Sequence, residues 1–206
     1  IVIITTNIFY AIGLNAAASS SIGIVAGLLV LGAFHENGLA NMLDTFTEGS
    51  KKEERLKTIA KRRLATYGTL GLIFYTFLKI SLISNLLGTP SCFLLVVGAH
   101  ALGRTAMVIL RKFSIAASDK SYDLLFSKAS SGQVILSILL GAIWLIPISF
   151  SLFIVSTFII LMFTLGLRFL ASKKIGGISN EVLGASVLIG EILLLIFFNL
   201  LFAVES

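Results

Sequence analysis

The chain has 206 residues, of which 57% are hydrophobic and 13% are charged, and its mean hydropathy is +1.02. A soluble domain carries about 25% charged residues, so this composition argues against a soluble globular enzyme. The 16 Lys and Arg residues outnumber the 10 Asp and Glu residues. In a membrane protein, basic loops are first an orientation signal, so the positive charge does not indicate nucleic-acid binding.

Long apolar runs alternate with polar stretches along the chain. Because a spanning helix needs about 20 mostly apolar residues, we expect an all-α, polytopic membrane protein with about seven membrane segments. The first run is short, which suggests a missing N-terminal part, and no linker divides the chain, so we expect one integral membrane domain over 1–206. In chain order the runs cover residues 1–14, 21–34, 64–87, 91–110, 132–146, 148–167 and 182–204.

Most basic residues lie in three polar stretches, at 35–63, 111–131 and 168–180. With seven spans these stretches all fall on one side, and the breaks on the other side contain no Lys or Arg. The positive-inside rule then predicts that the three stretches face the cytoplasm and that the protein is integral to the cell membrane.

Three formally charged residues, Lys79, Arg104 and Glu191, fall inside apolar runs. Such groups are costly at membrane depth and usually mark a functional cavity. The alternatives are that Lys79 snorkels to the interface and that Glu191 forms a structural ion pair. Arg104 follows His100 by four residues, so both side chains can share one helix face. This pair favours a polar cavity open to the cytoplasm.

The segment from His35 to Asp44, HENGLANMLD, begins the first basic stretch. Asn37, Asn41 and Asp44 are spaced i, i+4, i+7, so on a helix they share one face. Three oxygen-bearing side chains on one face suggest a Mg²⁺ site for substrate phosphates. The alternative is a capping and turn motif, because Asn-Gly is a common turn dipeptide.

This segment resembles the H-x-D-G-L-A-D-x-x-D motif of the cobalamin 5'-phosphate synthase family, also called adenosylcobinamide-GDP ribazoletransferase. The resemblance continues through residues 54–79, the tripeptide 102–104 and residues 176–191. It implies a Mg²⁺-dependent membrane enzyme of the last steps of cobalamin assembly. Such an enzyme joins adenosylcobinamide-GDP to α-ribazole or its 5'-phosphate and releases GMP. The motif is also related to that of the CDP-alcohol phosphotransferases.

The resemblance implies roles for individual residues. We expect His35, Asp44 and Arg63 to be catalytic; Asn37, Asn41, Asp44 and Glu181 to hold the metal; and Thr66, Tyr67, Lys79, Arg104, Gly176 and Gly177 to bind substrate. Guanidinium groups chelate phosphate oxygens, so Arg63 and Arg104 are the expected diphosphate ligands.

Two motif Asp residues are replaced, by Asn37 and Asn41, which predicts weak Mg²⁺ binding and slow turnover. The alternatives are a non-catalytic or diverged membrane binding protein, a CDP-alcohol-type phosphotransferase, and a small transporter. Besides its substrates, the expected partners are the lipid bilayer and, in a homo-oligomer, a second copy of the chain.

Overall fold

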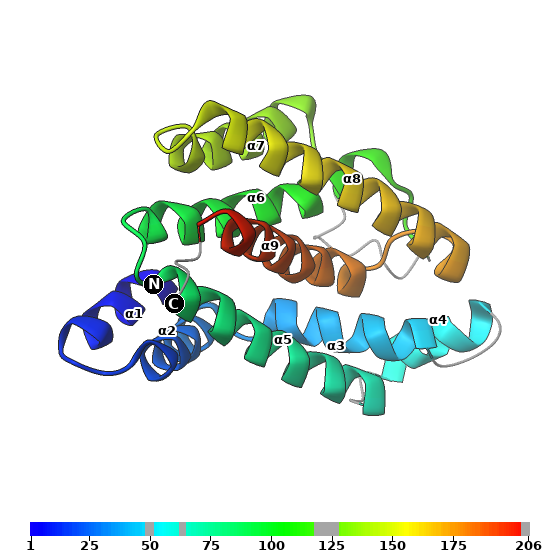
Figure 1. Ribbon diagram of the computed structural model, residues 1–206. Helices are drawn as coiled ribbons and strands as arrows, with labels where there is room; N and C mark the ends of the chain where they lie inside the picture. Colours follow the sequence, from blue (N-terminus) through cyan, green and yellow to red (C-terminus); the bar gives the residue numbers. More distant parts are fainter. Residues whose placement is uncertain (48–51, 62–64, 118–127, 203–206) are drawn as a thin grey trace.

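The computed structural model describes residues 1–47, 52–61, 65–117 and 128–202, with the backbone alone at 57–61. Within these residues the regular structure is helical, apart from one isolated parallel bridge between Ala116 and Ile178. Figure 1 shows the helices, which are α1 (Val2–Ala11), α2 (Ala16–Leu31), α3 (Phe34–Thr47), α4 (Lys52–Lys61), α5 (Thr66–Leu86), α6 (Cys92–Phe113), α7 (Ser131–Leu145), α8 (Phe150–Ile175) and α9 (Asn180–Phe202).

Four helices of the described chain, α5, α6, α8 and α9, are long and apolar enough to cross a membrane. A fifth span results if α2 and α3 count as one, although they meet at a bend of 95°. Helices α1 and α7 are apolar but have only 10 and 15 residues, fewer than the roughly 20 that a span needs. The all-α membrane class is therefore confirmed, whereas seven spans stay a prediction.

Helix α9 lies between α6 and α3 at the centre of the bundle (Figure 1). Glycines allow α3 and α6 to pack closely against α9. A Cβ on Gly38 of α3 would lie 3.0 Å from the Cα of Gly184, and one on Gly103 of α6 would lie 3.0 Å from the carbonyl oxygen of Val187. Small residues let helix backbones pack this closely in membranes, so these glycines fix α9 against both neighbours.

The first basic stretch is mostly helical, since it contains α3 and α4. Asn37 and Gly38 lie inside α3, so the turn alternative for this dipeptide is wrong. The chain bends earlier, at Gly32, whose φ of 72° is a conformation that favours glycine. Gly38 instead allows α3 to pack closely against α9, and the motif residues lie in a helix of the bundle.

The basic stretches meet at one end of the bundle, on the right in Figure 1. The Lys174 ammonium donates to the Phe46 carbonyl at 3.1 Å, and Arg55 donates to the Lys174 carbonyl at 3.4 Å. The Ile178 amide donates to the Ile115 carbonyl at 2.9 Å. These bonds join segments from all three stretches. Helix α8 also extends further than its apolar run, so the third stretch begins within a helix.

Candidate functional site

A pocket with a polar floor and apolar walls lies beside the bend between α2 and α3. Its enclosed volume is about 40 Å³, and the figure rises to about 450 Å³ when the open space at its mouth is included. Its polar lining residues come from α3, α5, α6 and α9 and are His35, Glu36, Lys79, His100, Arg104 and Glu191. Its apolar lining residues are Val2, Ile24, Leu28, Leu31, Val187 and Leu188.

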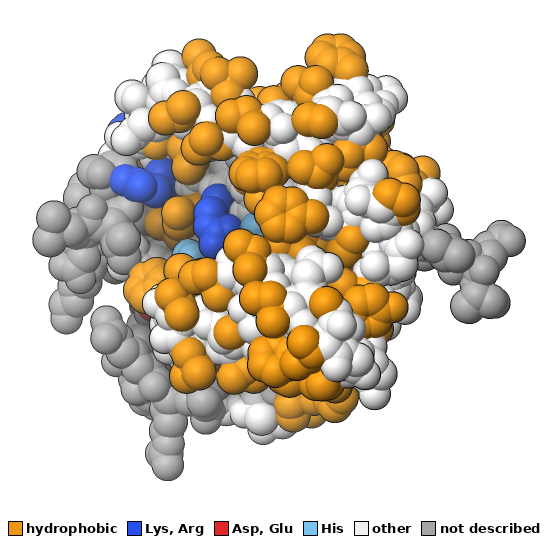
Figure 2. Space-filling view, turned by 90° about the vertical axis from the view of Figure 1, so that its left-hand side faces the viewer, with side chains coloured by type: hydrophobic (Ala, Val, Ile, Leu, Met, Phe, Trp, Pro, Cys, Tyr) orange, Lys and Arg blue, Asp and Glu red, His pale blue; other side chains and the backbone are white. Residues whose placement is uncertain are grey.

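The two histidines mark the position of this pocket in the space-filling view (Figure 2). The chain has two His residues, and both line the pocket. Figure 2 shows His and Lys or Arg side chains in a hollow bordered by hydrophobic ones. An amphipathic opening of this kind suits a ligand that carries both apolar rings and charged groups.

A buried ion pair forms the floor of the pocket. The Lys79 ammonium lies 2.7 Å from Glu191 Oε1, and the two side chains are 7% and 2% exposed. The ammonium also donates to the Tyr75 hydroxyl at 3.0 Å. Buried charges require such pairing, and the inward direction of Lys79 shows that snorkelling is wrong for this residue. The ion pair that was the alternative for Glu191 is present, and it lines the pocket.

Helix α6 contributes an imidazole and a guanidinium to the same pocket. His100 Nδ1 lies 2.8 Å from the Val96 carbonyl oxygen, and His100 Nε2 lies 3.2 Å from Glu191 Oε1. Arg104 donates from Nη1 to the His100 carbonyl at 2.7 Å. The helix-face relationship expected for His100 and Arg104 is thus observed, and both side chains border the cavity.

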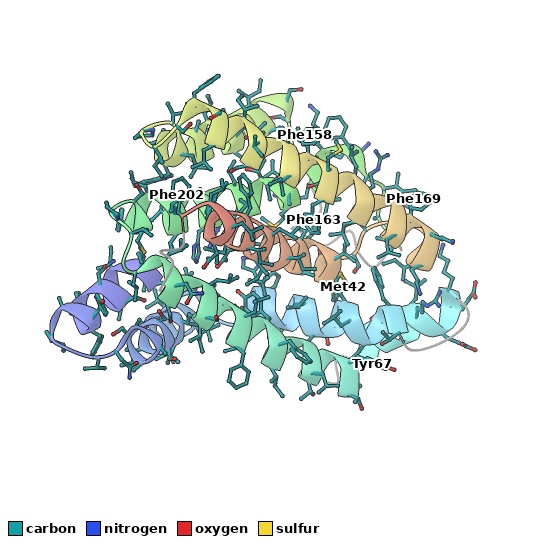
Figure 3. The ribbon with its side chains drawn as sticks, viewed as in Figure 1. Met42, Tyr67, Phe158, Phe163, Phe169 and Phe202 are labelled. Atoms are coloured by element: carbon teal, nitrogen blue, oxygen red, sulfur yellow. The ribbon has the colours of Figure 1, made fainter. Side chains whose placement is uncertain are left out.

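The expected catalytic and substrate-binding residues fall into two regions. The pocket brings together His35, Lys79 and Arg104. Thr66 and Tyr67 are instead exposed in the first turn of α5. Figure 3 shows Tyr67 at this end of the helix, whereas Lys79 lies towards its C-terminal end. At 1.5 Å per residue, Thr66 lies roughly 20 Å along the axis from Lys79. Arg63 lies outside the described residues, so its place relative to the pocket stays a prediction.

The two glycines expected to bind substrate have backbone reasons to be glycine. Gly176 ends α8 in the left-handed conformation, with φ of 80°, which other residues adopt at a cost. A Cβ on Gly177 would lie 2.6 Å from the Ile115 carbonyl oxygen. Both glycines therefore shape the basic end of the bundle, and substrate binding by them stays a prediction.

The expected metal ligands on α3 differ in environment. Asn37 is exposed, Asn41 is half-buried and Asp44 is buried. Both oxygens of the Asp44 carboxylate accept backbone hydrogen bonds from the start of α5, Oδ2 from Ala65 at 2.8 Å and Oδ1 from Gly68 at 2.6 Å. The carboxylate thus caps α5, where the positive end of the helix dipole favours an anion.

This donor set fits Mg²⁺ poorly. The ion is usually bound by carboxylates and water in a near-octahedral arrangement. Here each Asp44 oxygen already accepts one hydrogen bond from α5 and keeps one further lone pair, and Asn37 and Asn41 offer only neutral amides. Glu181, the remaining expected ligand, is half-buried in the first turn of α9. Within the part of the chain that the structure describes, no three His, Cys, Asp or Glu side chains form a metal-binding group.

Tyr75 was not among the residues predicted from the sequence, and His100 had no separate predicted role. Tyr75 precedes Lys79 by four residues, and this spacing was the available signal, since i, i+4 side chains are neighbours on a helix. The contact between His100 and Glu191 had no local signal, because it depends on how α6 packs against α9.

The apolar helices and the buried charges between them define a polytopic helical membrane protein. Residues 1–199 match the family model of Cobalamin-5-phosphate synthase, and the chain belongs to this family. The resemblance seen in the motifs is therefore confirmed, and the chain is a membrane transferase of cobalamin biosynthesis.

Three curated relatives are each named Adenosylcobinamide-GDP ribazoletransferase. The protein of Shewanella woodyi is 31% identical over 187 residues, covering 87% of this chain and 72% of the relative. That of Vibrio parahaemolyticus is 33% identical, covering 81% of this chain and 64% of the relative. That of Shewanella piezotolerans is 34% identical, covering 82% and 67%. No solved structure shows a significant match.

Proposed function

We propose that the chain joins adenosylcobinamide-GDP to α-ribazole or its 5'-phosphate and releases GMP. The observation that carries this proposal is the pocket that unites His35, Lys79 and Arg104 beneath apolar walls. Both substrates combine apolar ring systems with hydroxyl or phosphate groups. Apolar lining with a few convergent polar groups is the usual composition of a site for such molecules.

Arg104 is the proposed ligand for phosphate oxygens in this pocket. The charge of Lys79 is already paired with Glu191, so Lys79 is better suited to position its neighbours. Arg104 uses Nη1 for the His100 carbonyl, and a guanidinium carries five N–H donors in all. The remaining donors suit bidentate binding of a diphosphate. No step of this proposal depends on Mg²⁺, because the described donors fit the ion poorly.

The test is GMP release by the purified protein in detergent with both substrates supplied. We expect release that depends on the acceptor, and we expect Arg104→Lys to raise the KM for adenosylcobinamide-GDP at least tenfold, since charged hydrogen bonds contribute about 1.5–3 kcal/mol. Arg168→Lys is the matched control, because Arg168 is exposed on α8. Binding of adenosylcobinamide-GDP without any GMP release would favour the second candidate, a non-catalytic membrane binding protein.

We also propose that the basic end of the bundle faces the cytoplasm of the cell membrane. The argument is the positive-inside rule together with the contacts that gather the basic stretches. In a Cys92→Ser background, Glu53→Cys marks the basic end and Ser151→Cys marks the opposite end; both positions are exposed. Labelling intact cells with an impermeant maleimide should modify position 151 alone, and labelling of position 53 would reverse the orientation.

A further inference from the structure

One ring nitrogen of His100 is fixed, and the other is left for a ligand. Nδ1 lies 2.8 Å from the Val96 carbonyl oxygen. A carbonyl oxygen only accepts, so the neutral tautomer that satisfies this contact carries its hydrogen on Nδ1 and its lone pair on Nε2. Nε2 is buried in the pocket lining, where Glu191 Oε1 lies 3.2 Å away, and it makes no hydrogen bond among the described residues. A buried polar atom without a partner is unfavourable, so a hydroxyl that donates to Nε2 would be stabilised there.

The charges around Nε2 suit a group that gains a proton. The titratable and charged groups lining the same pocket or touching them are Tyr75 and Lys79 on α5, Arg104 on α6, Glu191 on α9, and His35 and Glu36 on α3. The cations Lys79 and Arg104 oppose a further positive charge on the ring, whereas the Glu191 carboxylate favours one. Once Nε2 is protonated, Glu191 Oε1 lies 3.2 Å away and stabilises the imidazolium.

Helix packing holds this arrangement in place. The Cα of Glu191 lies close to Gly103, since a Cβ on that glycine would be 3.3 Å away. The Lys79 ammonium holds Glu191 Oε1 at 2.7 Å. The carboxylate therefore has little freedom to turn away from the imidazole, and Lys79 and Glu191 act as positioning residues.

From this geometry we infer that His100 is the proton acceptor for the attacking hydroxyl of the acceptor substrate; the inference rests on the proposed function. The hydroxyl O–H bond breaks and its proton moves to His100 Nε2. The freed oxygen forms a bond to the phosphorus that carries the cobinamide. The P–O bond to GMP breaks, and GMP leaves with that electron pair.

The kinetic test is His100→Gln, which keeps a polar side chain of similar reach but cannot accept the proton. We expect kcat to fall by about 10²- to 10⁴-fold, the usual contribution of general-base catalysis, with little change in the KM for adenosylcobinamide-GDP. The decline of the wild-type rate at low pH, where the imidazolium cannot accept a proton, should disappear. A variant that keeps kcat within about threefold, or keeps that decline, overturns the inference.

A second measurement does not need activity. In a His35→Asn variant, isotope-labelled His100 gives the single histidine NMR signal, because the chain has two His residues. We expect the Nδ1–H tautomer, and a shift of the Nε2 resonance when α-ribazole is added. An unmoved resonance overturns the inference even where GMP is released. A shifted resonance in this variant, combined with no GMP release by the wild-type protein, overturns the proposed function and the proton transfer, and leaves His100 as a binding residue only.

Discussion

The Lys79 ammonium and the Glu191 carboxylate lie 2.7 Å apart, on helices that come together only in the folded bundle. Replacing one partner leaves a buried charge without compensation, which costs about 3–5 kcal/mol. We therefore expect Glu191→Gln and Lys79→Met each to lower the unfolding midpoint of the protein in detergent. The double variant removes both charges and should recover much of the loss. Additive losses in the double variant would show that the pair is not energetically coupled.

Asp44 gives a second stability prediction, because its carboxylate caps α5. Loss of an N-terminal cap costs about 0.5–2 kcal/mol, so Asp44→Ala should lower the unfolding midpoint. Asp44→Asn keeps an acceptor oxygen and should lower it less. Asn37→Ala is the control, since Asn37 is exposed on the same helix. If both Asp44 variants abolish GMP release while the midpoint stays at the wild-type value, the carboxylate is catalytic and the cap is dispensable.

The fold class could be predicted from the sequence because apolar runs and basic stretches are local patterns. The number of spans could not, since helix ends and bends depend on packing. Gly32 bends the chain by 95° between α2 and α3, and no hydropathy average separates a bent pair from two spans. Helices α1 and α7 likewise proved shorter than a usual span.

The site was predictable only in part, for the same physical reason. Lys79, Arg104 and Glu191 were identifiable individually, because a charge within an apolar run is costly. Their meeting in one pocket required the packing of α5, α6 and α9. For Asp44 the motif pattern indicated a metal ligand, which stays a prediction; the hydrogen bonds that its carboxylate accepts from Ala65 and Gly68 join segments on either side of α4, and no spacing rule anticipates them.

The crossing of α3 and α9 provides a third prediction. A Cβ on Gly38 would lie 3.0 Å from the Glu181 carbonyl oxygen and from the Gly184 Cα. Both are backbone atoms, so Gly38→Ala must separate the helices, and overpacking costs about 1–3 kcal/mol. Gly166→Ala is the matched control inside α8, where an added Cβ meets nothing within 4 Å. We expect the control to be neutral or stabilised by up to about 1 kcal/mol, and equal midpoints for the two variants would contradict the close crossing.

The last prediction concerns Mg²⁺, which the family resemblance implies. Asn37 and Asn41 stand where the motif has Asp. Two unit charges 4 Å apart interact by about 4 kcal/mol at an effective dielectric near 20, before any discount for solvent, so each lost carboxylate charge weakens the attraction for a cation. We expect weak Mg²⁺ binding by this chain, and we expect Asn37→Asp with Asn41→Asp to raise the affinity by at least an order of magnitude. The exposed position of Asn37 and the half-buried position of Asn41 leave room for hydrated carboxylates.

Calorimetric Mg²⁺ titration of the parent and of the double variant measures this directly, and GMP release across the same titration measures its effect on turnover. A variant carrying Asp44→Asn besides the two new carboxylates is the control, because it restores the motif charges while removing the third. We expect it to lose most of the gained affinity if Asp44 is a ligand of the ion, through the lone pairs that its hydrogen bonds to α5 leave free. Full activity of the parent at low Mg²⁺, with no gain in the double variant, would show that catalysis does not use a cation at these three positions. The pocket around His100 and Arg104 would then carry the reaction without them.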